Sequence, residues 1–166
     1  MAKISHDSET LAEGQQVITA VAMITADFDG VTKVFLPKRA DTKKFLPGVH
    51  EMPGGHIDFG EELKAGLARE IDEEFGMRVS IGDAFAAFTY TNDIKKSHSV
   101  EIVFFARFTD PIENIKLNPE DHSAASWFSE EELPNAYTGG KDSDDIEFQI
   151  VRKGFALLSG TPVERG

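Results

Sequence analysis

GHIDFGEELKAGLAREIDEEFGM, residues 55–77, carries the strongest structural signal in the chain. Its second half predicts an α-helix over residues 62–75, because helix-forming residues dominate, no proline interrupts them, and a leucine or isoleucine recurs every four positions. Gly76 supplies the usual stop just past the helix end. The apolar positions form one stripe, which predicts that this helix packs on a core.

Carboxylates crowd one edge of the expected helix. Glu70, Glu73 and Glu74 fall within a sector about 100° wide beside the apolar stripe. Two carboxylates about 5 Å apart repel by roughly 3 kcal/mol at an effective dielectric near 20, and these also lie at the negative end of the helix dipole. Arg69 offsets one charge. Two interpretations fit the rest: a solvated acidic face, or a site where oxygen ligands bind Mg²⁺ or Mn²⁺.

The residues around the helix start favour the metal site. Pro53-Gly54-Gly55 places two flexible residues where backbone can approach a ligand closely, and Glu61 lies at the helix entry, where amide groups bind anions. Gly66, inside the helix, costs about 1 kcal/mol relative to alanine. Its presence predicts close packing or substrate access at that point.

The spacing of these residues resembles the signature box of the Nudix hydrolases. Gly55, five residues, Glu61, seven residues and then the run REIDEEFGM from Arg69 match the box at every fixed position. The resemblance implies an α/β fold, a Nudix-type α/β/α sandwich with a mixed central β-sheet. It also implies that this loop and helix bind a divalent metal and the diphosphate of a small-molecule nucleotide.

The resemblance also implies roles for individual residues. The metal, Mg²⁺ or Mn²⁺, is expected on Gly55, Glu70, Glu73 and Glu74. Arg69 is expected to orient the acids by bidentate pairing, and Glu61 either binds metal or holds Arg69. Two general bases fit, Glu70 beside the metal and Glu120 from a later loop, while a metal-bound hydroxide needs neither.

Further candidate residues flank the box. Arg39, near the end of a predicted strand, is expected to contact phosphate because of the family resemblance, and His56 fits either a substrate contact or a structural position. Lys43 and Lys44 follow Arg39 in a polar segment, for which we predict a solvated loop.

The remaining elements follow from local patterns. Strands are predicted at 16–26, 31–39, 78–81, 84–91 and 99–108, with a hairpin turn at Asp29-Gly30, and helices at 129–136 and 146–158. Phe85, Phe88 and Tyr90 fit either the core or a surface on which a base stacks. Residues 137–145 are predicted to form an exposed loop.

Composition limits the class of protein. The 166 residues, 40% hydrophobic and 10% aromatic, predict one domain over residues 15–160, with a loose arm at 1–14 and a tail at 161–166. A formal net charge of -12 argues against nucleic acid or acidic membranes as partners, and the absence of cysteine excludes thiol chemistry. No segment resembles a membrane span or a signal peptide, so a cytoplasmic location is expected. A homodimer is left open.

The predicted reaction is hydrolysis of a phosphoanhydride bond in a nucleoside diphosphate linked to another group. A nucleoside triphosphate is the first choice, because features expected of ADP-ribose, dinucleoside polyphosphate and coenzyme A hydrolases are absent. The alternatives are a nucleotide sugar or a dinucleotide. A nucleotide-sensing module without catalysis is a further alternative, against which the complete set of box acids argues.

Overall fold

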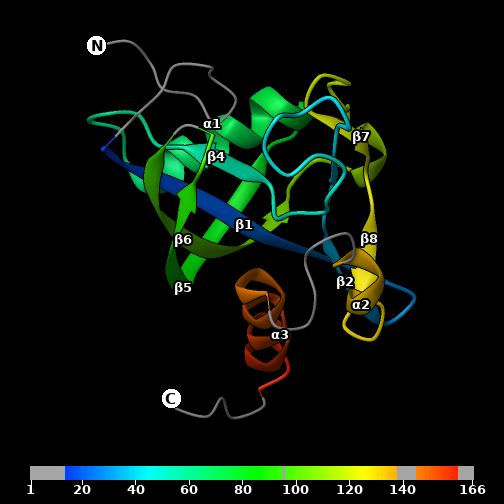
Figure 1. The fold of residues 1–166 in the computed structure, drawn as a ribbon. Helices are drawn as coiled ribbons and strands as arrows, with labels where there is room; N and C mark the ends of the chain where they lie inside the picture. Colours follow the sequence, from blue (N-terminus) through cyan, green and yellow to red (C-terminus); the bar gives the residue numbers. More distant parts are fainter. Residues whose placement is uncertain (1–13, 95, 138–144, 161–166) are drawn as a thin grey trace.

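The computed structural model describes residues 14–94, 96–137 and 145–160 (Figure 1). Its elements, in chain order, are β1 Gln16–Phe28, β2 Val31–Phe35, β3 Lys38–Arg39, β4 Gly54–His56, α1 Leu63–Phe75, β5 Val79–Asn92, β6 Ser97–Phe108, a 3₁₀ turn at Ile112–Asn114, β7 His122–Ala124, β8 Trp127–Ser129, α2 Leu133–Ala136 and α3 Ile146–Leu158. The predicted terminal arm and tail lie outside the described residues, apart from Gly14. The division into a single domain with two loose ends stays a prediction.

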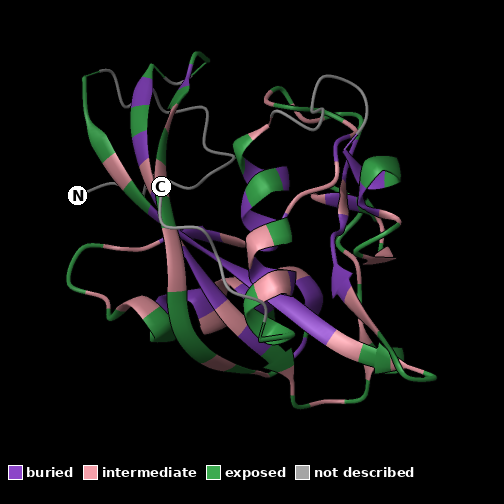
Figure 2. Cartoon of the chain, turned by 90° about the horizontal axis from the view of Figure 1, so that it is seen from below, coloured by how far each residue is buried: buried purple, intermediate pink, exposed green. Residues whose placement is uncertain are grey.

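Strand β1 organises a mixed sheet of order β5-β6-β1-β2-β8. It pairs in parallel with β6 and antiparallel with β2, and β4 pairs antiparallel with part of β1. The middle of β1 is buried on both faces, as predicted (Figure 2). The hairpin between β1 and β2 forms at Asp29 and Gly30, both of which have positive φ.

Helices cover the two faces of this sheet. Alternate residues of β1 point to opposite faces. Ala20, Ala22 and Ile24 pack in a cluster with the buried residues of α1, whereas Val21 and Met23 pack in a second cluster with those of α3. The predicted α/β/α sandwich is confirmed. No helix in the described part of the chain has the length and apolar character needed to span a bilayer.

Helix α1 begins and ends where its sequence predicts. The Glu62 side chain caps the first turn by accepting a hydrogen bond from the Ala65 amide at 2.8 Å. Gly76 ends the helix with φ +62°, a left-handed conformation that glycine adopts without strain. Leu67, Ile71 and Phe75 are fully buried against the sheet, so packing fixes the direction in which the carboxylate edge points.

Two predicted strand boundaries are wrong. The strand expected at 31–39 stops at Phe35, because Pro37 has no N–H for a ladder, and Lys38 and Arg39 pair instead with β7. The strands expected at 78–81 and 84–91 form one continuous strand, β5, with irregular register after Ile81. The helix expected at 129–136 is only the short α2, Leu133–Ala136.

Gly54 lets β4 approach β1 closely. Its φ is +155°, and an added Cβ would overlap the carbonyl oxygen of Ala20 on β1. We expect Gly54→Ala to lower the free energy of unfolding by about 2 kcal/mol through overpacking, measured by urea denaturation. Gly82→Ala in β5 is the control, because its Cβ would lie 3.4 Å from the nearest atom, an ordinary contact. Equal losses in the two variants would contradict this account of Gly54.

Candidate active site

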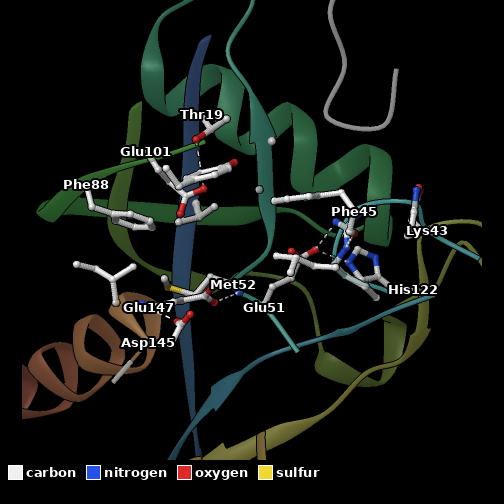
Figure 3. A pocket seen from close by; sticks show the side chains of 18 of the residues that line it. Thr19, Lys43, Phe45, Glu51, Met52, Phe88, Glu101, His122, Asp145 and Glu147 are labelled. Carbon is white, nitrogen blue, oxygen red and sulfur yellow. Dashed lines mark hydrogen bonds and ion pairs between the residues drawn. The ribbon is translucent and has the colours of Figure 1, made fainter. Parts of the chain in front are cut away.

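A cavity of about 290 Å³ lies beside α1 and the first turn of α3 (Figure 3). Its walls come from β1, β3, β4, β5, β6 and β7 and from the loop after β3, so segments far apart in sequence meet there. Such a concave, mostly apolar space with a few polar groups is typical of a ligand site. Of residues 55–77, Gly55 and Glu74 line it.

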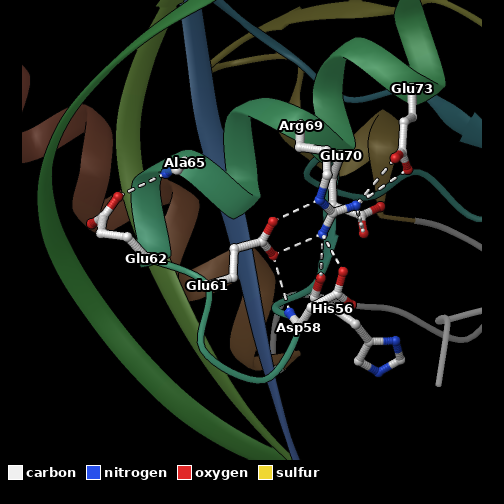
Figure 4. Close-up of polar contacts among 8 residues, drawn as sticks. All are labelled: His56, Asp58, Glu61, Glu62, Ala65, Arg69, Glu70 and Glu73. Atoms are coloured by element: carbon white, nitrogen blue, oxygen red, sulfur yellow. Dashed lines mark hydrogen bonds and ion pairs between the residues drawn. The ribbon is translucent and has the colours of Figure 1, made fainter. Parts of the chain in front are cut away.

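Arg69 of α1 binds the carboxylates of Glu61, Glu70 and Glu73 (Figure 4). Its Nε donates to Glu61 Oε2 at 2.7 Å and its Nη2 to Glu61 Oε1 at 2.9 Å, a bidentate pair of the kind predicted. Its Nη1 donates to Glu70 Oε1 at 2.9 Å and to Glu73 at 3.3 Å. Hydrogen bonding to Glu61, more than to Glu70, raises the pKa of the Arg69 guanidinium far above its ordinary value. Arg69 therefore stays charged at any working pH.

Gly66 makes room for the Glu61 side chain. An added Cβ at this position would lie 2.6 Å from Glu61 Oε1. Of the two consequences predicted for a glycine inside this helix, the structure shows close packing. Of the two roles predicted for Glu61, it shows the holding of Arg69.

The oxygen donors predicted for the metal are divided between Arg69 and the cavity. An added Cβ on Gly55 would lie 2.5 Å from Glu70 Oε2, so the absence of a side chain leaves space for that carboxylate. Glu74 lines the cavity with Gly55, whereas Glu73 is half exposed and faces Arg69. In the described ranges, no three His, Asp or Glu side chains are arranged to hold a metal ion. The donor chemistry suits Mg²⁺ or Mn²⁺, and the assignment of these ligands stays a prediction.

Two ion pairs lie at the end of the cavity away from the start of α3 (Figure 3). Arg39 is 3% exposed; its Nε donates to the carbonyl of Phe45 and its Nη1 to Glu51 Oε1, each at 3.0 Å. Lys43 Nζ donates to Asp121 Oδ1 at 2.8 Å. Arg39 thus lines the cavity, where a phosphate contact was predicted, but with its guanidinium already bound to protein acceptors.

The solvated loop predicted for Lys43 is wrong. Its side chain is only 11% exposed, because the loop after β3 folds over the cavity and the ion pair with Asp121 holds the ammonium in the wall. Lys44 is exposed, as predicted. Sequence position alone does not separate two adjacent lysines of which one is turned inward.

The loop before β7 presents residues other than the predicted Glu120. Glu120 is exposed and lies outside the cavity wall, while Asp121 and His122 line it. The amides of Asp121 and His122 both donate to the Asn118 carbonyl at 2.9 Å, which makes a tight turn with Glu120 at its outer side. Its placement therefore gives no support to a catalytic role for Glu120, which stays a prediction.

His56 is likewise outside the cavity wall. It is 6% exposed, and its carbonyl oxygen accepts a hydrogen bond from Arg69 Nη2 at 3.1 Å. This backbone contact links β4 to the carboxylates of α1. A substrate contact by the His56 side chain stays a prediction.

Aromatic rings form another part of the wall. Tyr90 and Phe88 line the cavity, and the Tyr90 ring is nearly parallel to that of Phe45, with 6.3 Å between centroids. Burial, followed by the charge of Glu101, raises the pKa of the Tyr90 hydroxyl. Phe85 instead stacks on Phe105 at 4.0 Å in the core. Two roles were left open for these rings, packing in the core or stacking with a base. Phe85 packs with the core, whereas Phe88 and Tyr90 line the cavity.

The start of α3 closes the cavity. Of the exposed loop predicted at 137–145, only the two end residues are described, and Tyr137 is buried, contrary to the prediction. Asp145 caps α3 and lines the cavity, while Tyr137 is 4% exposed. The Tyr137 hydroxyl and the Met52 amide both donate to Glu147 Oε1, at 3.2 and 2.8 Å. Residues 138–144, between Tyr137 and Asp145, lie outside the described part of the chain.

The wall also contains three residues that were not predicted to belong to the site, Phe45, Glu101 and Glu147. A signal existed for Glu101, because it is an acidic residue within a mostly apolar strand, and such a residue is seldom buried without a polar partner. It is 8% exposed and accepts a hydrogen bond from the Thr19 hydroxyl at 3.2 Å. Phe45 and Glu147 have no such signal, since only the folded chain brings them to the site.

Comparisons with known proteins agree with this arrangement. A family model described as NUDIX domain matches residues 17–147. The m7GpppN-mRNA hydrolase NUDT17 of Danio rerio is 36% identical over 77 residues, which are 46% of this chain and 24% of that protein. The nucleoside triphosphatase NudI of Salmonella arizonae is 35% identical over 60 residues, 36% of this chain and 42% of that protein. The matches thus span less than half of each of these relatives.

A solved structure has the same fold at low identity. An Ap4A hydrolase from C. elegans, solved as a binary complex, superimposes with a TM-score of 0.69 over 87% of this chain and 98% of that chain, at 21% identity. At this level of identity the likeness supports the fold and carries no information about the substrate.

Proposed function

The chain belongs to the NUDIX domain family, and from this premise we propose that it is a metal-dependent pyrophosphohydrolase. Its substrate would be a nucleoside diphosphate linked to another group, cleaved by water at a phosphoanhydride bond. The relatives that share its domain are named as hydrolases and nucleoside triphosphatases. A cytoplasmic location and a homodimer stay predictions.

One observation carries the proposal: Gly55 and Glu74 line a ligand-sized cavity, next to the carboxylates of Glu61 and Glu70 that are bound by Arg69. Gly55, Glu70, Glu73 and Glu74 would hold Mg²⁺ or Mn²⁺, which supplies Lewis-acid stabilisation of phosphate charge and acidifies bound water. Arg69 keeps Glu61 and Glu70 in fixed positions, so the acidic edge needs little reorganisation during the reaction. Glu70 would be the general base: its carboxylate lies against Gly55, which lines the cavity, whereas Glu120 is exposed outside the wall.

A nucleoside triphosphate is the proposed substrate. The name of the Salmonella relative supports this choice, and the aromatic wall formed by Phe45, Phe88 and Tyr90 offers flat surfaces for a base. A dinucleotide and a nucleotide sugar are the alternative substrates. The third alternative, a sensor that binds nucleotide without turnover, is opposed by the complete set of acids in residues 55–77.

A release assay over a nucleotide panel tests these alternatives. The chain is incubated with Mg²⁺ and nucleoside triphosphates, nucleotide sugars or dinucleoside polyphosphates, and the products are separated by chromatography: pyrophosphate or phosphate from a triphosphate, a nucleoside monophosphate and a sugar phosphate from a nucleotide sugar, and two nucleotides from a dinucleoside polyphosphate. We expect fastest release from a triphosphate and a loss of at least about a hundredfold when EDTA removes the metal. Tight nucleotide binding with no release from any compound would instead identify a sensor.

A further inference from the structure

His122 is a buried polar residue of the cavity wall for which the proposed reaction gives no role. It is 3% exposed and lines the cavity. Neither Nδ1 nor Nε2 of its imidazole has a hydrogen-bond partner. An unsatisfied buried polar group costs about 1–3 kcal/mol, so a stable protein that keeps one normally uses it.

Packing holds this imidazole in position. The ring lies against Phe75 of α1, with 5.0 Å between centroids, and Phe75 is fully buried. Its Nε2 is 3.5 Å from Glu51 Oε1, beyond ordinary hydrogen-bond distance, and that oxygen already accepts from Arg39 at 3.0 Å. The ring is thus fixed by its apolar contacts, while its nitrogens are left for another partner.

The charges around His122 indicate the chemistry of that partner. All lysine and arginine side chains in the cavity wall, Arg39 and Lys43, lie at this end, because Arg39 is paired with His122 across β3 and β7 and Lys43 binds the neighbouring Asp121. The other end carries Glu101, Asp145 and Glu147 (Figure 3). An anionic group is therefore repelled less at the His122 end than anywhere else in the wall.

A metal ion is not the partner that this geometry favours. Glu51 and Asp121, the carboxylates next to His122, are each paired with a basic side chain of the wall. An imidazole N–H, in contrast, donates to a phosphate oxygen in either its neutral or its protonated form.

We propose that His122 is a substrate-binding residue, whose imidazole donates a hydrogen bond to a phosphate oxygen of the nucleotide. The proposal rests on the proposed function for the class of ligand. It adds a contact outside residues 55–77, at the end of the cavity formed by β3 and β7. The substrate would supply the hydrogen bond that the folded chain does not.

The test replaces the imidazole with a ring that has no nitrogen. In His122→Phe the contact with Phe75 is kept and both unsatisfied atoms are removed, so we expect an unchanged or higher melting temperature. We expect affinity for inorganic pyrophosphate with Mg²⁺, measured by calorimetry, to fall about tenfold. Calorimetry reports on His122 even if no nucleotide is hydrolysed, which keeps this test separate from that of the proposed reaction.

A matched control uses a histidine whose hydrogen bond is made within the chain. His50 Nδ1 lies 2.9 Å from the Leu36 carbonyl, and its ring contacts Phe128 edge-on. We expect His50→Phe to lower the melting temperature and leave pyrophosphate affinity unchanged. If His122→Phe behaves in the same way, the imidazole is structural and the proposal is overturned.

A second variant and a second class of ligand complete the test. His122→Gln places an amide near the position of Nε2, and we expect this variant to recover part of the affinity. If His122→Phe does not fold, His122→Gln decides the test. The proposal is overturned if His122→Phe is folded and both variants bind pyrophosphate with wild-type affinity. Adenosine and guanosine, which lack phosphate, form the last arm. A loss confined to these nucleosides, with pyrophosphate affinity intact, would also overturn the assignment to phosphate.

Discussion

Glu74→Gln is expected to reduce hydrolysis of the best nucleotide by about a thousandfold while the chain stays folded. Glu74 is the box carboxylate that lines the cavity, and the amide keeps its shape but not its charge. A neutral oxygen donor binds Mg²⁺ or Mn²⁺ far less well than a carboxylate does. Steady-state release of phosphate or pyrophosphate with saturating Mg²⁺ measures the effect.

The folded state should tolerate this change. Glu74 lies in the last turn of α1, where a negative charge opposes the helix dipole, so its removal is expected to leave the melting temperature equal or slightly higher. Asp72→Asn is the matched control, because it removes the same charge from an exposed position on the same helix. We expect it to retain near-wild-type turnover. Near-normal turnover in Glu74→Gln would exclude Glu74 from the metal site.

Arg69→Lys is expected to lower both activity and stability. Lysine keeps the positive charge but has no planar fork, so it cannot reproduce the two hydrogen bonds to Glu61 together with those to Glu70 and the His56 carbonyl. Loss of about 2 kcal/mol corresponds to roughly 4–8 °C in melting temperature for a chain of this size. Misplacement of the carboxylates by about 1 Å is expected to reduce turnover about a hundredfold.

Arg78→Lys controls for the loss of a bidentate arginine elsewhere. Arg78 donates through Nε and Nη2 to Asp110, but its side chain is 82% exposed, and exposed pairs contribute little to stability. We expect a shift of about 1 °C or less and unchanged turnover. If both lysine variants show the same small effects, Arg69 does not organise the acidic edge.

Local sequence was sufficient where a single segment makes the structure. The helix at residues 62–75, its stop at Gly76 and the hairpin at Asp29 and Gly30 all depend on backbone preferences and on apolar spacing within a few residues. The buried strand at 16–26 was found for the same reason. Strand ends were less well predicted. The chain leaves β2 at Pro37, but β3 is a separate strand only because it pairs with β7, which is distant in sequence.

Only the part of the site formed by residues 55–77 could be predicted from the sequence. The spacing of Gly55, Glu61 and the acids after Arg69 is a property of one loop and one helix, so it is visible in the chain. The other half of the wall was less visible in the sequence: Lys43 was expected in solvent, and Phe45 was not singled out. Glu120 lies outside the wall, and its catalytic role stays a prediction. No local pattern marks these residues.

The sequence by itself determined the acidic helix, its packing face and the family to which the chain belongs, because these follow from residue types at short spacing. Only the tertiary structure decided that Glu74 faces the cavity while Arg69 holds Glu61 and Glu70, and that His122 is buried there with its nitrogens unused. The physical reason is that side-chain direction and burial depend on contacts between strands and helices distant in sequence, which compete for the same donors, acceptors and space.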